Sequence, residues 1–173
     1  MGCSVLCRDG KILAYTIQKG FIPGLQRFAP PAGIEFVKDD QTFAVVSRLI
    51  SSLKWSGVAN IDLKYDEKNR QVNVLEVNGR YWATILGSLV AGVNFPYLAC
   101  LAGLGISFSR PDYRLNRFIR GNAAIIRGYL CKSKVNFTFK ETSWRYALTD
   151  SLPEVISLTR KGWRTLSQSF GRR

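Results

Sequence analysis

The chain has 173 residues, of which 46% are hydrophobic; this is enough to bury the core of one domain and excludes a wholly disordered tail. Its 25 Lys and Arg against 12 Asp and Glu give a net charge of +13, which favours a polyanion such as nucleotide phosphate, nucleic acid or an anionic membrane surface without choosing among them. The chain contains no His, so the commonest general base and imidazole metal ligands are excluded, and nucleophiles of the Ser-His or Cys-His kind are not supported.

The four cysteines lie at positions 3, 7, 100 and 131. They show neither the paired spacing of a zinc site nor a secretory leader that would favour a disulfide framework. We therefore expect Cys3 and Cys7 to be small buried hydrophobic residues, and a reducing, cytoplasmic location for the protein.

The chain begins with a predicted β-hairpin, because "CSVLC" and "ILAYTI" are apolar runs joined by the Asp-Gly turn in "RDGK". Residues 19–37 are rich in Gly and Pro and predict a long connecting loop. In residues 39–55 the apolar side chains follow helical spacing, with Asp39 or Asp40 available as the N-cap, so this segment predicts an amphipathic helix.

A second predicted hairpin follows, in which "GVANIDLKYD" and "QVNVLEVN" are strands joined by the polar "EKNR". Alternation along the second strand puts Glu76 and Asn78 on one face, with Val74 and, if the strand continues, Arg80. Asp62 lies on the neighbouring strand and reaches the same face as Glu76 if the register allows.

Two carboxylates, an amide oxygen and an arginine are the groups that a hard divalent cation and a nucleotide polyphosphate together require. A solvent-facing strand with polar residues at alternate positions explains the same spacing equally well. Lys11 in the first turn and Lys64 beside Asp62 are candidates to bind phosphate, although exposed basic side chains are more often simply solvated.

Residues 81–109 contain no charged side chain, and this run is longer than a membrane span requires. Several glycines, Asn94 and Pro96 interrupt it, so it predicts two short buried helices joined by the turn "AGVNFP". A single span through the membrane is the alternative.

The basic residues are concentrated after residue 109, where 14 Lys and Arg accompany 4 Asp and Glu. We expect a short helix near residues 122–130, a strand near residues 135–140 and a terminal amphipathic helix from residue 150. Arginines mixed with aromatic residues in this extension also permit binding to nucleic acid, and its last helix permits binding to an anionic membrane surface.

The segment from "GVANIDLKYD" to "ACLAGLG" resembles the C-terminal half of the ATP-grasp fold, as found in carbamoyl phosphate synthase, D-alanine–D-alanine ligase and carboxylate–amine ligase-like proteins. The matching positions are Asp62, Glu76, Asn78, Arg80 and the turn "GVNFP". The resemblance implies that ATP and Mg²⁺ are the cofactors, that Asp62, Glu76 and Asn78 are metal ligands, and that Arg80 is catalytic. The family often has proline where this chain has Gly79.

The predicted fold is therefore α+β: an antiparallel sheet backed by helices over residues 1–109, as in the C-terminal lobe of an ATP-grasp enzyme, and a basic, partly helical extension over residues 110–173. The resemblance implies a ligase that activates a small carboxylate as an acyl phosphate and joins it to an amine or similar nucleophile. A first lobe and a substrate domain are expected upstream or on a separate chain, so we expect this chain alone to be inactive. The alternative is a non-enzymatic basic module that binds nucleic acid or an anionic membrane.

Overall fold

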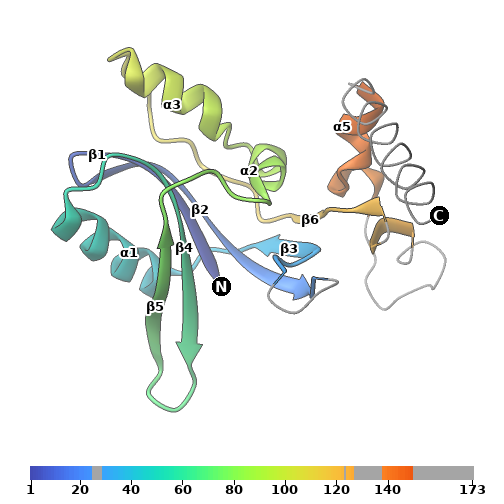
Figure 1. The fold of residues 1–173 in the computed structure, drawn as a ribbon, viewed down its shortest axis with the longest axis horizontal. Helices are drawn as coiled ribbons and strands as arrows, with labels where there is room; N and C mark the ends of the chain where they lie inside the picture. Colours follow the sequence, from blue (N-terminus) through green and yellow to red (C-terminus); the bar gives the residue numbers. More distant parts are fainter. Residues whose placement is uncertain (25–28, 123, 127–137, 150–173) are drawn as a thin grey trace, which may run out of the picture.

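The computed structural model describes residues 1–24, 29–122, 124–126 and 138–149, and they form a sheet with helices on both faces (Figure 1). The strands are β1 (Gly2–Arg8), β2 (Lys11–Ile22), β3 (Gly33–Phe36), β4 (Gly57–Asp66), β5 (Gln71–Asn78) and β6 (Arg117–Ile119). The helices are α1 (Asp40–Leu53), α2 (Ile85–Ala91), α3 (Phe95–Gly103) and α5 (Trp144–Thr149), with a 3₁₀ turn, η1, at Phe139–Glu141.

The six strands form one antiparallel sheet in the order β5-β4-β1-β2-β3-β6. Both predicted hairpins are present, and the pairing of β1 with β4 joins them into one sheet. The first hairpin turns at Asp9 and Gly10, which both have positive φ, as a two-residue turn of this type requires. The predicted α+β class and the antiparallel sheet are therefore confirmed.

Strand β3 lies in a segment that was predicted as loop, and β6 lies where no element was predicted. The Gly- and Pro-rich segment 19–37 is not one long loop, since β2 runs to Ile22 and β3 pairs with it through a register shift. A Cβ at Gly33 would lie 2.7 Å from the Ile22 side chain. Gly33 thus permits the close packing of β3 on β2. A count of turn-forming residues cannot distinguish such a glycine from one in a loop.

Helix α1 covers one face of the sheet, which we call the α1 face. The helix begins as predicted, because the Asp39 carboxylate accepts a hydrogen bond of 2.7 Å from the Thr42 backbone N–H. Its buried residues Val46 and Ile50 pack on side chains from β1, β2 and β4, which form a core that contains Cys3 and Cys7. Both cysteines are buried, as predicted.

Helices α2 and α3 lie on the opposite face, which we call the α2/α3 face (Figure 1). Gly92, at φ 108°, ends α2, and the Asn94 side chain caps α3. The two predicted short helices are confirmed, and their axes meet at 90°. Within the described residues no single helix is long and apolar enough to cross a membrane, and only this bent pair taken together meets the length and composition required.

The first helix or strand in the C-terminal extension is β6, which continues the sheet beyond residue 109. Residues 122 and 124–126 are helical, in agreement with the start of the helix predicted near residues 122–130. Residues 139–141 form a 3₁₀ turn where a strand was predicted, since the Glu141 side chain returns to the Thr138 backbone in a capping box. The predicted terminal helix lies outside the described residues.

Candidate functional site

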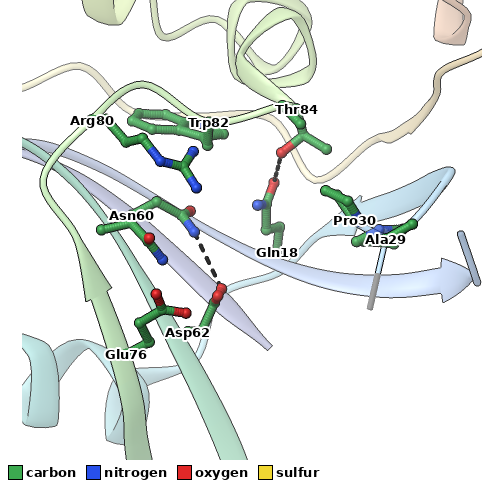
Figure 2. A pocket seen from close by; sticks show the side chains of 12 residues that line it. Gln18, Ala29, Pro30, Asn60, Asp62, Glu76, Arg80, Trp82 and Thr84 are labelled. Carbon is green, nitrogen blue, oxygen red and sulfur yellow. Dashed lines mark hydrogen bonds between the residues drawn. The ribbon is translucent and has the colours of Figure 1, made fainter. Parts of the chain in front are cut away.

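A cleft of about 390 Å³ opens on the α2/α3 face of the sheet, beside the start of α2 (Figure 2). Side chains from β2, β4 and β5 form its base, the segment 29–31 forms one wall, and the segment 80–84 forms another. The lining residues are Gln18, Ala29, Pro30, Pro31, Asn60, Asp62, Glu76, Asn78, Arg80, Trp82, Ala83 and Thr84.

The register of the strands explains why polar side chains meet in this cleft. Gly2 on β1 pairs with Gln18 on one side and with Asp62 on the other, and Asp62 pairs with Glu76. Two residues before Asp62 on β4, Asn60 pairs with Asn78. Paired residues of antiparallel strands point to the same face, so these side chains form one surface. We call Gln18, Asn60, Asp62, Glu76 and Asn78 the polar floor.

A β-bulge in β5 is needed to bring Glu76 to this surface. The register shifts between Asp62, which pairs with Glu76, and Leu63, which pairs with Val74, so Leu75 is the extra residue. Leu63 is buried in the α1-face core, and Val74 therefore points to that side. The prediction that Val74 shares a face with Glu76 is wrong, because the bulge reverses the alternation between them.

Asp62 and Glu76 lie side by side at the base of the cleft (Figure 2). Asn60 Nδ2 donates to Asp62 Oδ1 at 3.2 Å, and Ser4 Oγ donates to Asn60 Oδ1 at 3.0 Å, so a buried hydroxyl sets the orientation of the amide. Burial raises the pKa of Asp62, and the neighbouring Glu76 charge raises it further, while the bond from Asn60 and the positive charges of the N-terminal ammonium and of Arg80 oppose the shift. Ionised Asp62 is thus incompletely compensated by the residues around it.

The donor set suits magnesium better than a transition metal. Two carboxylates and the Asn78 amide supply hard oxygen ligands, and Mg²⁺ is commonly held by one or two carboxylates together with substrate phosphates and water. Among the described residues, no group of three or more His, Cys, Asp or Glu side chains could hold a metal ion. A metal ion in this cleft would therefore need further ligands, such as phosphate and water.

Arg80 lies in the same cleft but beyond the end of β5, not on its face. Its backbone N–H donates to the Asn78 carbonyl at 2.8 Å, and its Nη1 donates to the Tyr81 carbonyl at 3.3 Å. Beside it, Trp82 is buried with its ring edge-on to Phe95 at a centroid distance of 4.8 Å. The turn after β5 therefore places the exposed guanidinium of Arg80 in the cleft, beside the packed ring of Trp82.

The two lysines predicted to bind phosphate lie apart from the cleft. Lys11 begins β2 beside the hairpin turn, whereas Gln18 lines the cleft near the other end of the hairpin. Lys64 is exposed and pairs with Asn73 beyond the bulge. The structure thus brings together Asp62, Glu76, Asn78 and Arg80 but neither lysine.

The sequence analysis missed the contributions of Gln18, Asn60 and Thr84 to the cleft. Gln18 is 8% exposed and Thr84 is 3% exposed. A signal was present, because Thr16 and Gln18 are polar residues two apart in the otherwise apolar run of residues 12–18, the same spacing as Glu76 and Asn78. Their partners on other strands could not be identified without the register.

Comparison with known proteins gives a match over most of this region. A family model described as ATP-grasp in the biosynthetic pathway with Ter operon matches residues 19–119, a range that contains every residue lining the cleft except Gln18 and also includes β6. No curated protein matches the sequence. Among solved structures, the chain is similar to the L-amino acid ligase from Bacillus licheniformis, with 17% identity and a TM-score of 0.42 over 60% of this chain. The match spans 28% of that ligase.

Proposed function

The chain belongs to the ATP-grasp family, and from this we propose that it supplies the metal-binding side of the active site of an ATP-dependent ligase. In the proposed reaction a small carboxylate attacks the γ-phosphorus of ATP, forming an acyl phosphate and ADP. An amine or similar nucleophile then attacks the acyl carbon and displaces phosphate. The single observation that carries this proposal is the pairing of Asp62 with Glu76 at the base of one cleft with Asn78 and Arg80.

The polar floor has the residues that this reaction needs from one side of the active site. Asp62, Glu76 and Asn78 would hold Mg²⁺, and the ion would neutralise phosphate charge. Arg80 adds a positive charge that is required most when charge develops on the transferred phosphoryl group. This reaction depends on positioning and charge neutralisation, so the lack of His in the chain is compatible with it.

We propose that the remaining contacts with ATP come from a first lobe, either upstream or on another chain. Among the described residues that line the cleft, Arg80 is the one basic side chain, and several negative charges on ATP would need further cations. We also propose that residues 1–109 form the second lobe and that residues 110–173 form a basic extension, which contributes β6 to the same sheet. Such a ligase, with three unpaired cysteines among its described residues, suits a cytoplasmic location.

The proposal is tested by measuring Mn²⁺ binding to the purified chain with electron paramagnetic resonance, where Mn²⁺ serves as a probe for Mg²⁺. We expect Glu76→Gln to weaken Mn²⁺ binding by at least about tenfold, because it removes one of two carboxylate ligands. Glu67→Gln is the matched control: it makes the same change in the exposed β4–β5 turn and should leave Mn²⁺ affinity unchanged.

Equal Mn²⁺ affinity in the wild type and Glu76→Gln would reject this assignment. Absence of Mn²⁺ binding, together with retention of DNA or RNA at moderate salt, would favour the basic module instead. We expect no ATPase activity from the chain alone, and the same Glu76→Gln change should abolish magnesium-dependent turnover in the complete enzyme.

A further inference from the structure

Gln18, like Asn60, is a residue of the polar floor whose amide is fixed by a buried hydroxyl. Its Oε1 accepts a hydrogen bond of 3.1 Å from Thr84 Oγ1, and both side chains are less than one-tenth exposed. With the oxygen engaged, the amide nitrogen points into the cleft, toward the side on which Asn60 and Arg80 lie (Figure 2). In the part of the chain that the structure describes, no group accepts a hydrogen bond from this nitrogen. A donor held in this way is pre-organised for an acceptor on a bound molecule.

Gly2 lies in the sheet between Gln18 and the carboxylates, within van der Waals reach of the Gln18 amide. It is the register partner of both Gln18 and Asp62, and it has no side chain to separate them. A Cβ at Gly2 would lie 3.4 Å from Gln18 Nε2 and 3.9 Å from Asn60 Oδ1. Since neighbouring strands are about 4.8 Å apart, Gln18 and Asp62 belong to strands about 10 Å apart. A small molecule lying over Gly2 can therefore contact both.

The wall next to Gln18 is apolar and firmly held. It consists of Ala29, Pro30 and Pro31. Pro31 packs closely on β2, since a Cβ at Gly20 would lie 3.0 Å from its side chain, and the next residue, Ala32, donates to the Ile22 carbonyl at 2.9 Å. The fixed φ of proline reduces the freedom of this wall further. It is suited to contact a short apolar group.

We propose that Gln18 binds the carboxylate of the substrate that is phosphorylated, with the substrate's apolar group against residues 29–31 and its carboxylate directed across Gly2 to the Asp62–Glu76 pair. Gln18 is then a specificity-determining residue, and Thr84 is a positioning residue that fixes the Gln18 amide. The substrate class is a small monocarboxylate with a short apolar group. This inference rests on the proposed function and identifies the substrate for the same cleft.

The charge distribution favours a carboxylate over a phosphate at Gln18. The amide is neutral, and the adjoining wall has no charge, whereas the cation Arg80 and the metal-binding carboxylates lie on the other side of the cleft (Figure 2). A phosphate with two negative charges binds best where cations are present, and a single carboxylate oxygen is adequately bound by an amide N–H.

The experiment is a nuclear magnetic resonance titration of the ¹⁵N-labelled 173-residue chain with sodium butyrate, with butyramide as the neutral probe of the same shape. We expect butyrate, but not butyramide, to shift the side-chain NH₂ signal of Gln18 in a saturable manner. Gln18→Glu should weaken butyrate binding at least tenfold, since it replaces the donor with a repelling carboxylate. Gln71→Glu, which adds the same charge at an exposed position at the far end of β5, should not change it.

Two further variants separate the role of Gln18 in binding from a role in folding. Gln18→Met removes the donor without adding charge, and Thr84→Val removes the hydroxyl that holds the amide. Both should weaken butyrate binding while Mn²⁺ still binds at Asp62 and Glu76, because neither contributes a metal ligand. A folded Gln18→Met chain that binds butyrate as tightly as the wild type would overturn the proposal.

The remaining outcomes are equally decisive. Failure of butyrate to bind at any concentration that leaves the fold intact would overturn the carboxylate assignment, and saturable shifts of Gln18 with inorganic phosphate but not butyrate would reassign the residue to the nucleotide. Butyrate binding at Gln18 without Mn²⁺ binding at Glu76 would support this carboxylate site while rejecting the proposed metal site, so the two failures are distinguishable.

Discussion

The two faces of the sheet are built from the same strands but from residues of opposite character. On β1, Cys3 packs toward α1 while Ser4 points to the other face and bonds to Asn60. On β4, Ile61 is fully buried in the α1-face core while the next residue, Asp62, lines the cleft. One face is therefore committed to burial of apolar surface, while part of the other carries polar side chains at the base of a cleft.

The core of the α1 face is apolar apart from its two thiols. Its two cysteines are inert thiols, because burial raises the pKa of Cys7 to about 12 and raises that of Cys3 further. On the α2/α3 face the apolar core and the polar floor lie next to each other, with Trp82 belonging to the first and lining the cleft of the second. Stability and binding should therefore respond separately to mutations on the two faces.

The largest expected effect is on the α1 face, at Ile61. Ile61→Ala should lower the free energy of unfolding by about 2–5 kcal/mol, because it leaves a cavity between the sheet and α1 at a position with no solvent exposure. Urea denaturation followed by circular dichroism measures this change. Metal binding by the fraction that remains folded should be unaffected.

Asp62→Asn is the neighbouring control on the other face, and it should give the reverse result. The amide keeps the size of the side chain and can still accept the hydrogen bond from Asn60, while the charge that metal binding requires is removed. We expect Mn²⁺ affinity to fall and stability at neutral pH to be retained or to rise. If Asp62→Asn were as destabilising as Ile61→Ala, the separation of the two faces would be refuted.

The second prediction concerns the contact that holds α2 over the sheet. A Cβ at Gly87 would lie 2.9 Å from Phe118 and 3.0 Å from Ile34, both of which are buried. Gly87→Ala should therefore lower the free energy of unfolding by about 1–3 kcal/mol through overpacking. It should also weaken butyrate binding, because displacement of α2 moves Thr84 away from Gln18.

Gly103→Ala provides the matched control for Gly87. It lies at the end of α3, where a Cβ would meet nothing within 4 Å. We expect this variant to be more stable by about 0.4–1 kcal/mol, since alanine loses less chain entropy on folding than glycine. Thermal unfolding of the two variants tests the pair, and destabilisation by both would show that helix geometry, not contact with Phe118, is responsible.

The sequence alone predicted those elements whose signals are local. The hairpin at Asp9 and Gly10, the helix capped by Asp39 and the two short helices before and after Gly92 follow from turn residues, caps and apolar spacing, and all are confirmed. Strands β3 and β6 could not be predicted. Each is short, and each is stabilised by pairing with residues distant in the chain, to which local propensity is insensitive.

For the cleft, the spacing of Glu76 and Asn78 correctly placed both on one face with Asp62 across from them. The same argument failed for Val74, because a bulge that adds one residue has no reliable signature in "VNVLEV". It also gave no indication of Gln18 or Thr84, which are 66 residues apart in the chain and come into contact only in the folded structure. Periodicity thus identifies a face of one strand, and the residues that complete a site across strands need the register.

The smallest expected effect, and the most specific to the polar floor, is a dependence of stability on pH. Because the fold raises the pKa of Asp62, folded chains retain a proton that unfolded chains have released as the pH rises above the ordinary carboxyl value of about 3.9. The contribution of this group to stability is therefore greatest below that value, falls as the pH rises to the higher folded pKa, and is constant above it. Asp62→Asn removes this titration.

The measurement is the difference in free energy of unfolding between Asp62→Asn and the wild type from pH 3 to pH 7, with and without Mg²⁺. Without the metal, the variant should gain stability relative to the wild type as the pH rises through the interval, by less than the losses predicted for Ile61→Ala and Gly87→Ala. Titrations elsewhere cancel in this difference, including those of Asp66 and Asp112, whose pKa values the fold lowers. Mg²⁺ should reverse the sign at neutral pH, because it stabilises only a chain in which Asp62 is ionised. A difference that is flat with pH and insensitive to Mg²⁺ would mean that Asp62 is an ordinary surface carboxylate, and the two faces would then differ in composition but not in their need for a ligand.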